Sequence, residues 1–200
     1  MKYLTPTTLL LQATTALATP LLASRQRQDP AVFTGVSSFR GQGCEGATVT
    51  YDSLSQVATI TYPNYGVVIP SGPREESCST TLQVRFPVGQ CTTGTASGTA
   101  TGTVNVPVGV TAFFSARDYA IQPTIGTITD VSPNGQWAGP RSEEYVLQDS
   151  IGYTLTPPNA QNNLVNFTVF GDLSLQPQNG PVGSLTNRGF VFDIRTQVPC

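Results

Sequence analysis

Proline and glycine interrupt every stretch of this 200-residue chain that would otherwise suit a helix. No window long enough for a helix repeats apolar side chains at i, i+3, i+4 and i+7. Short runs rich in Val, Ile, Thr, Tyr and Phe stand between turn residues instead, which is the pattern of β-strands. The sequence therefore predicts an all-β chain folded as an antiparallel, jelly-roll-like β-sandwich.

The expected strands share this composition and are Val32–Phe39, Ala47–Tyr51, Val57–Tyr62, Thr80–Phe86, Thr99–Val106, Val110–Ser115, Thr124–Val131, Gly152–Thr156, Leu164–Phe170 and Phe190–Gln197. Turns are expected between them, for example at Pro133-Asn134-Gly135. Two runs alternate clearly, with Leu82, Val84 and Phe86 in one and Phe190, Phe192 and Ile194 in the other. Such alternation is typical of strands with one buried face.

Residues 93–106 repeat with a period of two. The odd positions are Thr93, Thr95, Ser97, Thr99, Thr101, Thr103 and Asn105, and the even positions are Gly, Ala or Val. The simplest interpretation is a flexible Thr/Gly loop that leads into a strand with a solvated face. A fully extended segment would instead present a row of hydroxyls, either O-glycosylated or in contact with polysaccharide or ice. We expect a single row to be too narrow for ice.

The N-terminus predicts secretion. Lys2 precedes an apolar, Thr-rich segment, and Ala16-Leu17-Ala18 matches the small-x-small pattern of a cleavage site. We expect residues 1–24 to be a signal peptide, with a short pro-segment up to residue 28 as an alternative, and residues 29–200 to form a single β-sandwich domain. A membrane anchor is disfavoured because Gln12 and Pro20 interrupt a run that is already short.

Four cysteines, Cys44, Cys78, Cys91 and Cys200, follow this segment. An even number in a secreted chain predicts two disulfides, and three pairings are open. We favour Cys44 with Cys200, which would hold the C-terminus, and Cys78 with Cys91, which would close a short loop. No Cys-x-x-Cys pair indicates redox chemistry or a zinc ribbon.

Composition excludes several functions. The chain has no His, and its only lysine, Lys2, lies in the predicted signal peptide. Histidine-dependent catalytic triads, histidine-ligated metals, Schiff-base lysines and P-loops therefore have no residues to build them. Charged residues make up only 11% of the chain, and the formal net charge is −2, so no basic patch for nucleic acid is expected.

Aromatic residues beside turns are candidates for stacking on sugar rings. Tyr62 and Tyr65 flank Pro63-Asn64, and Trp137 follows Asn134-Gly135. The alternative is that these rings fill the sandwich core. Asn166-Phe167-Thr168 is an N-glycosylation sequon within an expected strand. If Asn166 is modified, its side chain faces solvent, and Phe167 and Val169 face the core.

Carboxylates are the remaining acid–base groups. Glu75-Glu76 and Glu143-Glu144 are adjacent pairs, and neighbours on a strand point to opposite faces, so neither pair makes a glycosidase dyad. A dyad would need different strands, for instance Asp118 with Asp149. We expect these acids to be solvated charges in turns. No calcium-loop motif is present, so we expect no metal and no cofactor.

Several short motifs resemble a fungal secreted family that carries the domain of unknown function numbered 4360. They are Gly41-Gln42-Gly43-Cys44, Gly46-Ala47-Thr48-Val49, Val57–Tyr65, Gly72-Pro73, Ser77-Cys78, Leu82–Gly89, Gly109-Val110, Gly139-Pro140, Tyr145 and Phe192–Val198. The resemblance covers most of residues 36–198 and implies a secreted, β-rich fungal protein without a known reaction. This chain lacks the family's usual Ser-Pro-Cys-Gly before the last strand, and Cys91 and Cys200 are additional.

We therefore expect a secreted, non-catalytic β-sandwich that acts by surface contact with cell-wall polysaccharide or an extracellular protein. Missing nucleophile and metal motifs favour this over catalysis. The alternatives are a carbohydrate-active hydrolase with paired carboxylates and a host-directed effector that binds a partner protein. No partner among nucleic acids or membranes is expected once the signal peptide is removed.

Overall fold

The computed structural model of the chain describes residues 31–52, 55–120, 128–156, 159–161, 163–177 and 180–197. These residues form twelve strands and one short 3-10 helix, η1 (Gln42–Cys44). All the strand pairings are antiparallel, and they build two sheets of six strands. The expected all-β, antiparallel fold is confirmed. The predicted signal peptide, the alternative pro-segment and Cys200 lie outside the described residues.

The first sheet, sheet A, has the order β1-β5-β11-β7-β8, with β9 also paired to β7. Its strands are β1 (Val32–Arg40), β5 (Glu75–Arg85), β11 (Leu164–Gln176), β7 (Thr111–Ala120), β8 (Ile128–Val131) and β9 (Asn134–Ala138). Strands β8 and β9 share one edge of β7 because they pair with different parts of it. Strand β11 therefore lies at the centre of this sheet.

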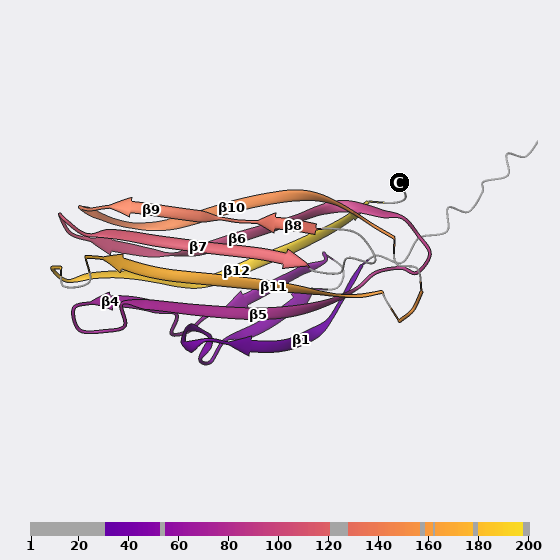
Figure 1. Cartoon of the computed structure of the whole chain (residues 1–200), viewed down its shortest axis with the longest axis horizontal. Helices are drawn as coiled ribbons and strands as arrows, with labels where there is room; N and C mark the ends of the chain where they lie inside the picture. The colour runs from indigo at the N-terminus through magenta and orange to yellow at the C-terminus, as the bar shows by residue number, and fades with distance from the viewer. Residues whose placement is uncertain are drawn as a thin grey trace, which may run out of the picture.

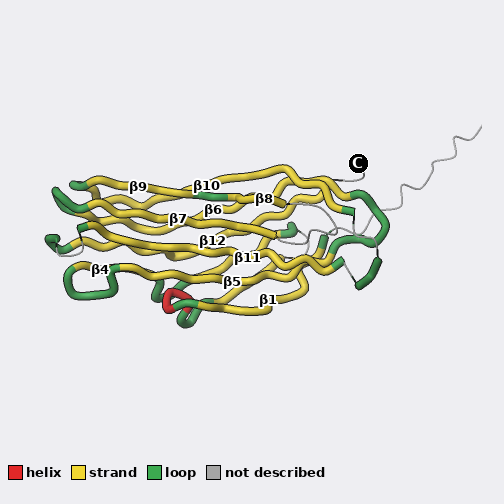
Figure 2. The backbone as a smooth tube through the Cα atoms, in the orientation of Figure 1, coloured by secondary structure: helices red, strands yellow, loops and turns green. Residues whose placement is uncertain are grey.

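The second sheet, sheet B, has the order β10-β6-β12-β3-β2, with β4 also paired to β12. Its strands are β10 (Arg141–Leu155), β6 (Thr92–Val106), β12 (Gly183–Gln197), β3 (Val57–Thr61), β2 (Thr48–Asp52) and β4 (Gly66–Ile69). The chain passes repeatedly from one sheet to the other, so consecutive strands often lie in different layers. Figure 1 shows the long strands running along the long axis of the molecule, and Figure 2 shows the turns gathered at its two ends.

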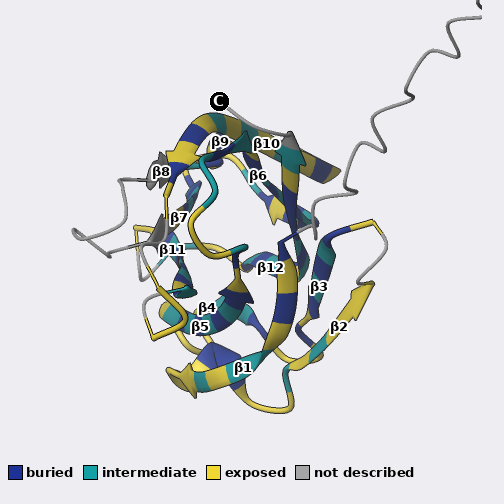
Figure 3. Cartoon of the chain, turned by 90° about the vertical axis from the view of Figure 1, so that its right-hand side faces the viewer, coloured by how far each residue is buried: buried dark blue, intermediate teal, exposed yellow. Residues whose placement is uncertain are grey.

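The core lies between the two sheets, where the buried residues of Figure 3 face inward. Aromatic rings connect the layers: Phe167 of β11 contacts Phe192 of β12 with ring centroids 5.1 Å apart, and Phe33 of β1 contacts the same ring at 6.2 Å. The alternation expected for Thr80–Phe86 is confirmed, because Leu82, Val84 and Phe86 are each 1% exposed, whereas in Phe190–Gln197 it is interrupted at Asp193, which is 8% exposed between the buried Phe192 and Ile194. Burial of these apolar faces is the main force that holds the sheets together.

The strands extend further than their apolar runs suggest. Strand β10 begins at Arg141, although only Gly152–Thr156 was expected, because its first four residues are polar and exposed at the edge of sheet B. Asn134 and Gly135, expected in a turn, belong to β9. Strand β4 was not expected at all. The expected strand Thr124–Val131 is described from Ile128 onward, and residues 124–127 lie outside the described residues.

The disulfide of the described residues joins Cys44 to Cys78, with Cα atoms 4.9 Å apart. Both favoured pairings, Cys44 with Cys200 and Cys78 with Cys91, are therefore wrong. Helix η1 turns the chain after β1 back over β5, which carries Cys78 near its start. Cys91 follows the far end of β5, and an extended strand rises by about 3.3 Å per residue, so the expected short loop does not exist.

Within the described ranges, no helix has the length and apolar character needed to span a membrane.

Candidate functional site

The Thr/Gly repeat forms one continuous strand, β6, rather than a flexible loop followed by a strand. Its even positions are buried, apart from the half-buried Gly94, while the odd positions from Thr93 to Asn105 are half-buried or exposed on the outer face of sheet B. The small even residues have a packing role. Gly102 pairs with Tyr145 and Gly94 pairs with Tyr153, and each tyrosine ring occupies the space of the missing side chain. This is the cross-strand rescue of glycine by an aromatic ring.

The hydroxyl row of β6 is not single, because β2 and β3 carry hydroxyls on the same face. Across the sheet, one row contains Val146, Thr101, Gly189, Thr61 and Thr48, and the next contains Gln148, Thr99, Val191, Thr59 and Thr50. Ala58 and Ile60, which alternate with Thr59 and Thr61 on β3, are fully buried, so those threonines point outward. We call the outward side chains of Thr48, Thr50, Thr59, Thr61, Thr95, Ser97, Thr99, Thr101 and Thr103 the threonine face.

Two ion pairs border the threonine face along its length. Arg188 pairs with Glu144, with Nη1 and Oε1 2.9 Å apart, beside Thr103. Arg195 pairs with Asp193, with Nε and Oδ2 2.8 Å apart, beside Ser97 and Thr95. The two rows between these pairs contain no charged side chain. The centre of the face is therefore uncharged, with threonine hydroxyls and methyls on either side of Val191 and Gly189.

A hollow of about 400 Å³ opens at one end of the threonine face. Strands β3 and β4 both pair with β12, and between them Tyr62 and Tyr65 keep backbone hydrogen bonds to β12 while Pro63 and Asn64 turn out of the sheet. Strand β12 carries a bulge between Asn187 and Gly189. The resulting wall consists of residues 62–66, Val68, Thr103, Thr186, Asn187 and Arg188. Bulges often occur beside binding sites because they redirect side chains.

Tyr62 and Tyr65, the candidate stacking rings, are 5% and 2% exposed. Their ring centroids lie 5.2 Å apart in an edge-to-face arrangement, and both residues contribute to the wall of the hollow. Tyr65 crosses the core: its ring covers Gly43, where a Cβ would come 2.2 Å from the ring, and its hydroxyl approaches Gly171. Burial raises the pKa of Tyr65 far above its usual value.

Trp137 does not form a platform for ligands. It is 8% exposed and packs on Tyr145 with ring centroids 4.8 Å apart, joining β9 to β10. Gly135 lies beneath the ring, because a Cβ there would come 2.3 Å from it. Trp137 therefore occupies a core position, the alternative to the stacking ring expected beside a turn, and it is part of the contact between the two sheets.

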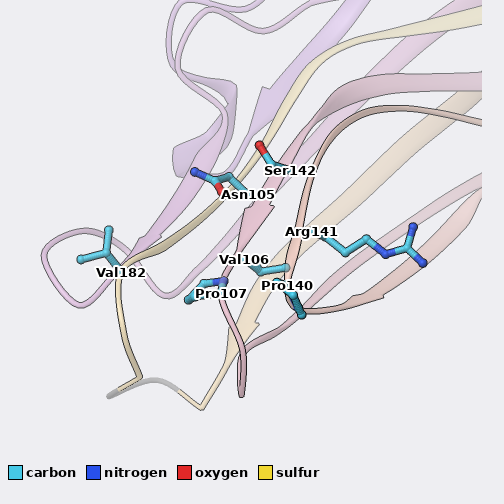
Figure 4. Close-up of a pocket in the computed structure, with 7 residues that line it drawn as sticks. All are labelled: Asn105, Val106, Pro107, Pro140, Arg141, Ser142 and Val182. Carbon is cyan, nitrogen blue, oxygen red and sulfur yellow. The ribbon is translucent and has the colours of Figure 1, made fainter.

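A second hollow, of about 320 Å³, lies at the end of the sandwich where three turns meet. Residues 105–107, residues 140–142 and Val182 line it. Figure 4 shows Pro107, Val106 and Pro140 at its centre, with Val182 to one side and the Arg141 side chain extending away on the other. Arg141 pairs with Glu143 at 3.3 Å. The lining is largely apolar, so it offers few groups that could orient a polar ligand.

Asp149, a candidate partner of Asp118 in a carboxylate dyad, is held by backbone hydrogen bonds. Asp149 accepts hydrogen bonds from the backbone N–H of Ser132 at 2.7 Å and of Ser150 at 2.8 Å, and the side chain of Asp118 lies outside the described residues. Glu143 and Glu144 lie on strand β10 rather than in a turn. Neither hollow is lined by a carboxylate. No cluster of three metal-ligating side chains occurs within the described ranges.

Asn166 lies on the central strand β11, exposed on the outer face of sheet A. Its Oδ1 accepts a hydrogen bond from Gln83 Nε2 at 3.3 Å. Phe167 and Val169 are 1% and 2% exposed on the opposite face, which is the expected orientation. The sequon and the threonine face therefore lie on opposite sides of the sandwich.

Comparison with family models assigns residues 32–198 to the family described as "Domain of unknown function (DUF4360)". The chain belongs to the DUF4360 family. Within this DUF4360 chain, the residues that carried the resemblance are structural: Gly43 makes room for Tyr65, and Cys44 is bonded to Cys78. No curated protein matches the chain in sequence.

Two solved structures show limited similarity to this DUF4360 chain. The first, described as "CBM4 structure and function", is 12% identical, with 81% of this chain and 86% of that chain covered and a TM-score of 0.26. The second, TmCBM61 in complex with beta-1,4-galactotriose, is 14% identical, with 84% and 90% covered and a TM-score of 0.29. TM-scores this low do not establish a shared fold. The description of the chain as a β-sandwich therefore rests on its own two sheets.

Sequence reasoning found the hydroxyl row and two residues of the hollow, but it missed Arg188 and Asn187 and expected Glu144 in a solvated turn. These residues lie together because β12 carries a bulge at the point where its paired neighbour changes from β4 to β3. The one local signal was Gly189 directly after Arg188, since a glycine within a strand often marks a bulge.

Proposed function

We propose that this protein is a secreted, non-catalytic β-sandwich that binds cell-wall or matrix polysaccharide through the threonine face. The observation that carries the proposal is the pair of uncharged rows that cross β10, β6, β12, β3 and β2 between two ion pairs. The origin in a fungus and the export of the chain belong to this proposal, on the strength of the family motifs and the N-terminal pattern.

A hydroxyl-rich face suits a polyhydroxyl ligand for a physical reason. Each threonine hydroxyl both donates and accepts hydrogen bonds, and each methyl offers apolar contact to the flat side of a sugar ring. Strand β6 extends for 15 residues, about 50 Å at about 3.3 Å per residue, so several sugar residues would fit along it. A flexible chain can follow the twist of a sheet, whereas a flat ice surface cannot.

The outer face of sheet A is less suited to a neutral ligand. Its exposed positions include Arg85 at the end of β5, Arg117 on β7 and Asp172 on β11. Partial burial of its carboxylate and the negative charge of nearby Glu75 raise the pKa of Asp172. The two outer faces therefore differ in charge, and the threonine face is the neutral one.

The effector alternative has less support. A protein-binding surface would present a contiguous apolar patch of several hundred Å². The exposed large apolar side chains of the described residues are mostly single residues on different strands and turns: Val32, Phe39, Tyr51, Val88, Val108, Val146 and Val182.

The test is retention of the chain on insoluble chitin, β-glucan and cell-wall fractions. T101E places a charge in the middle of the threonine face, and T81E places one at a half-exposed position on the central part of sheet A. We expect the wild type and T81E to be retained on at least one material and T101E to be lost from it. No retention on any material, or equal retention of both variants, would overturn the proposal. Circular dichroism confirms that both variants fold.

A further inference from the structure

The hollow beside the threonine face has a positively charged group in its wall. Among the described residues that line it, Arg188 is the one with a charge. Glu144 pairs with Arg188 through Nη1 but does not line the hollow. The side chains of this pair are 62% and 76% exposed, so water screens the pair and its two charges separate at little cost. The other N–H groups of the guanidinium fork are therefore available to a ligand.

The remaining wall combines polar side chains with Pro63, Val68 and two tyrosine rings, and its polar part is partly fixed in place. Thr103 and Thr186 hold their hydroxyl oxygens 2.6 Å apart across β6 and β12. Asn187 is 3% exposed, and its Oδ1 accepts a hydrogen bond from the N–H of Gly189 at 3.3 Å, which orients the amide. Asn64 lies in the segment that leaves the sheet. The wall thus combines one cation with hydroxyls and amides, in a volume within the range of small-ligand sites.

We propose that this hollow binds a sugar residue that carries a carboxylate, a uronic acid, with Arg188 as the partner of the carboxylate. Arginine recognises carboxylates through parallel N–H donors, and the hydroxyls and amides of the wall match the hydroxyls of a sugar ring. The inference deepens the proposed function and rests on it, because the uronic acid would belong to a polysaccharide whose neutral part lies along the threonine face. Glu144 then competes with the ligand for Arg188.

The competition gives a distinctive test. The full chain is titrated by NMR with glucuronate, galacturonate, glucose and acetate. We expect one of the uronates to shift the resonances of Arg188 and Asn187, with glucose and acetate much weaker. R188Q should weaken uronate binding about tenfold, as expected for a charged hydrogen bond. E144Q should tighten it about two- to fivefold, because the competing carboxylate is removed.

The matched control is R195Q, which removes the arginine of the other ion pair bordering the threonine face, away from the hollow. We expect R195Q to bind uronate as the wild type does. If acetate and uronate bind equally, or if R195Q and R188Q weaken uronate binding equally, the binding reflects general attraction to exposed arginines. Either result would overturn the proposed uronate site. No shift with either uronate would also overturn it.

The two proposals fail in different ways. If R188Q keeps full retention on insoluble polysaccharide and neither uronate binds, the hollow is not a site while the threonine face stands. If uronate binds through Arg188 but T101E is retained like the wild type, the hollow stands alone and the proposed role of the threonine face is wrong.

Discussion

The ring of Tyr145 lies across the backbone of its cross-strand partner Gly102. A Cβ at Gly102 would come 2.5 Å from the Tyr145 hydroxyl oxygen and 1.9 Å from the carbonyl oxygen of Thr186. That hydroxyl donates a hydrogen bond to the same carbonyl at 3.0 Å. The small residues on the inner side of β6 therefore admit the large residues of β10, and this packing keeps the odd-numbered hydroxyls on the outer face.

This packing predicts that G102A destabilises the fold strongly. The added methyl would collide with backbone atoms, so we expect a loss of about 3 kcal/mol in the free energy of unfolding, the upper end for overpacking. G152A is the matched control on β10, because its Cβ would meet only the Gly94 carbonyl oxygen at 3.8 Å. Urea denaturation of both variants tests this. Equal stability of the two variants would show that the Tyr145 contact does not constrain Gly102.

Buried tyrosines predict a loss of stability at alkaline pH. Burial raises the pKa of Tyr145 and Tyr153 well above the usual value of about 10. Above that pH the unfolded chain loses these protons while the folded chain keeps them. The free energy of unfolding therefore falls as pH rises, by about 1.4 kcal/mol per pH unit for each tyrosine. Below about pH 10 this contribution to stability is fully present.

Phenylalanine variants measured by urea denaturation at pH 7 and pH 11 separate the contributions. The Tyr153 hydroxyl is buried with no hydrogen-bond partner among the described residues, so Y153F should cost little at pH 7 and reduce the alkaline loss. Y145F should reduce it equally but cost about 1 kcal/mol at pH 7, because the hydrogen bond to Thr186 is removed. A Y153F variant with the full wild-type alkaline loss would contradict this explanation.

Much of the fold could be predicted because alternation is a local signal. The buried Phe190, Phe192 and Ile194 and the outward odd residues of β6 follow directly from a period of two. The sequence could not show that Gly94, Ala96 and Gly102 are small because tyrosines and other large side chains of β10 cover them. That information lies in the pairing of two strands far apart in the chain.

Edge strands and long-range contacts account for what was missed. Strand β10 has exposed polar residues at Arg141–Glu144, so its start carries no apolar alternation, and Asn134-Gly135 resembles a turn although it pairs with β7. The hollow was missed because it depends on a bulge and on the change from β3 to β4 along β12. None of these features has a strong signal within a short window of sequence.

The bonding of the other three cysteines predicts a second disulfide. Cys91 is itself disulfide-bonded, and with Cys44 and Cys78 joined to each other, Cys200 is the one cysteine left. We expect non-reducing peptide mapping to recover Cys44–Cys78 and Cys91–Cys200. A linked peptide containing Cys78 and Cys91 would contradict this prediction.

Glycans placed on either side of the sandwich test which face binds. Asn166 lies on the outer face of sheet A, so a glycan there should leave the threonine face open, and N166Q should be retained on polysaccharide like the wild type.

T99N creates a sequon in the centre of the threonine face, because Ala100 and Thr101 already supply its second and third positions. In a glycosylating host, we expect T99N to lose retention, and enzymatic removal of the glycan to restore it, because a bulky glycan blocks contact while one small side chain does not. Mass spectrometry establishes occupancy at both positions. Full retention of T99N with its glycan in place would show that the ligand binds elsewhere.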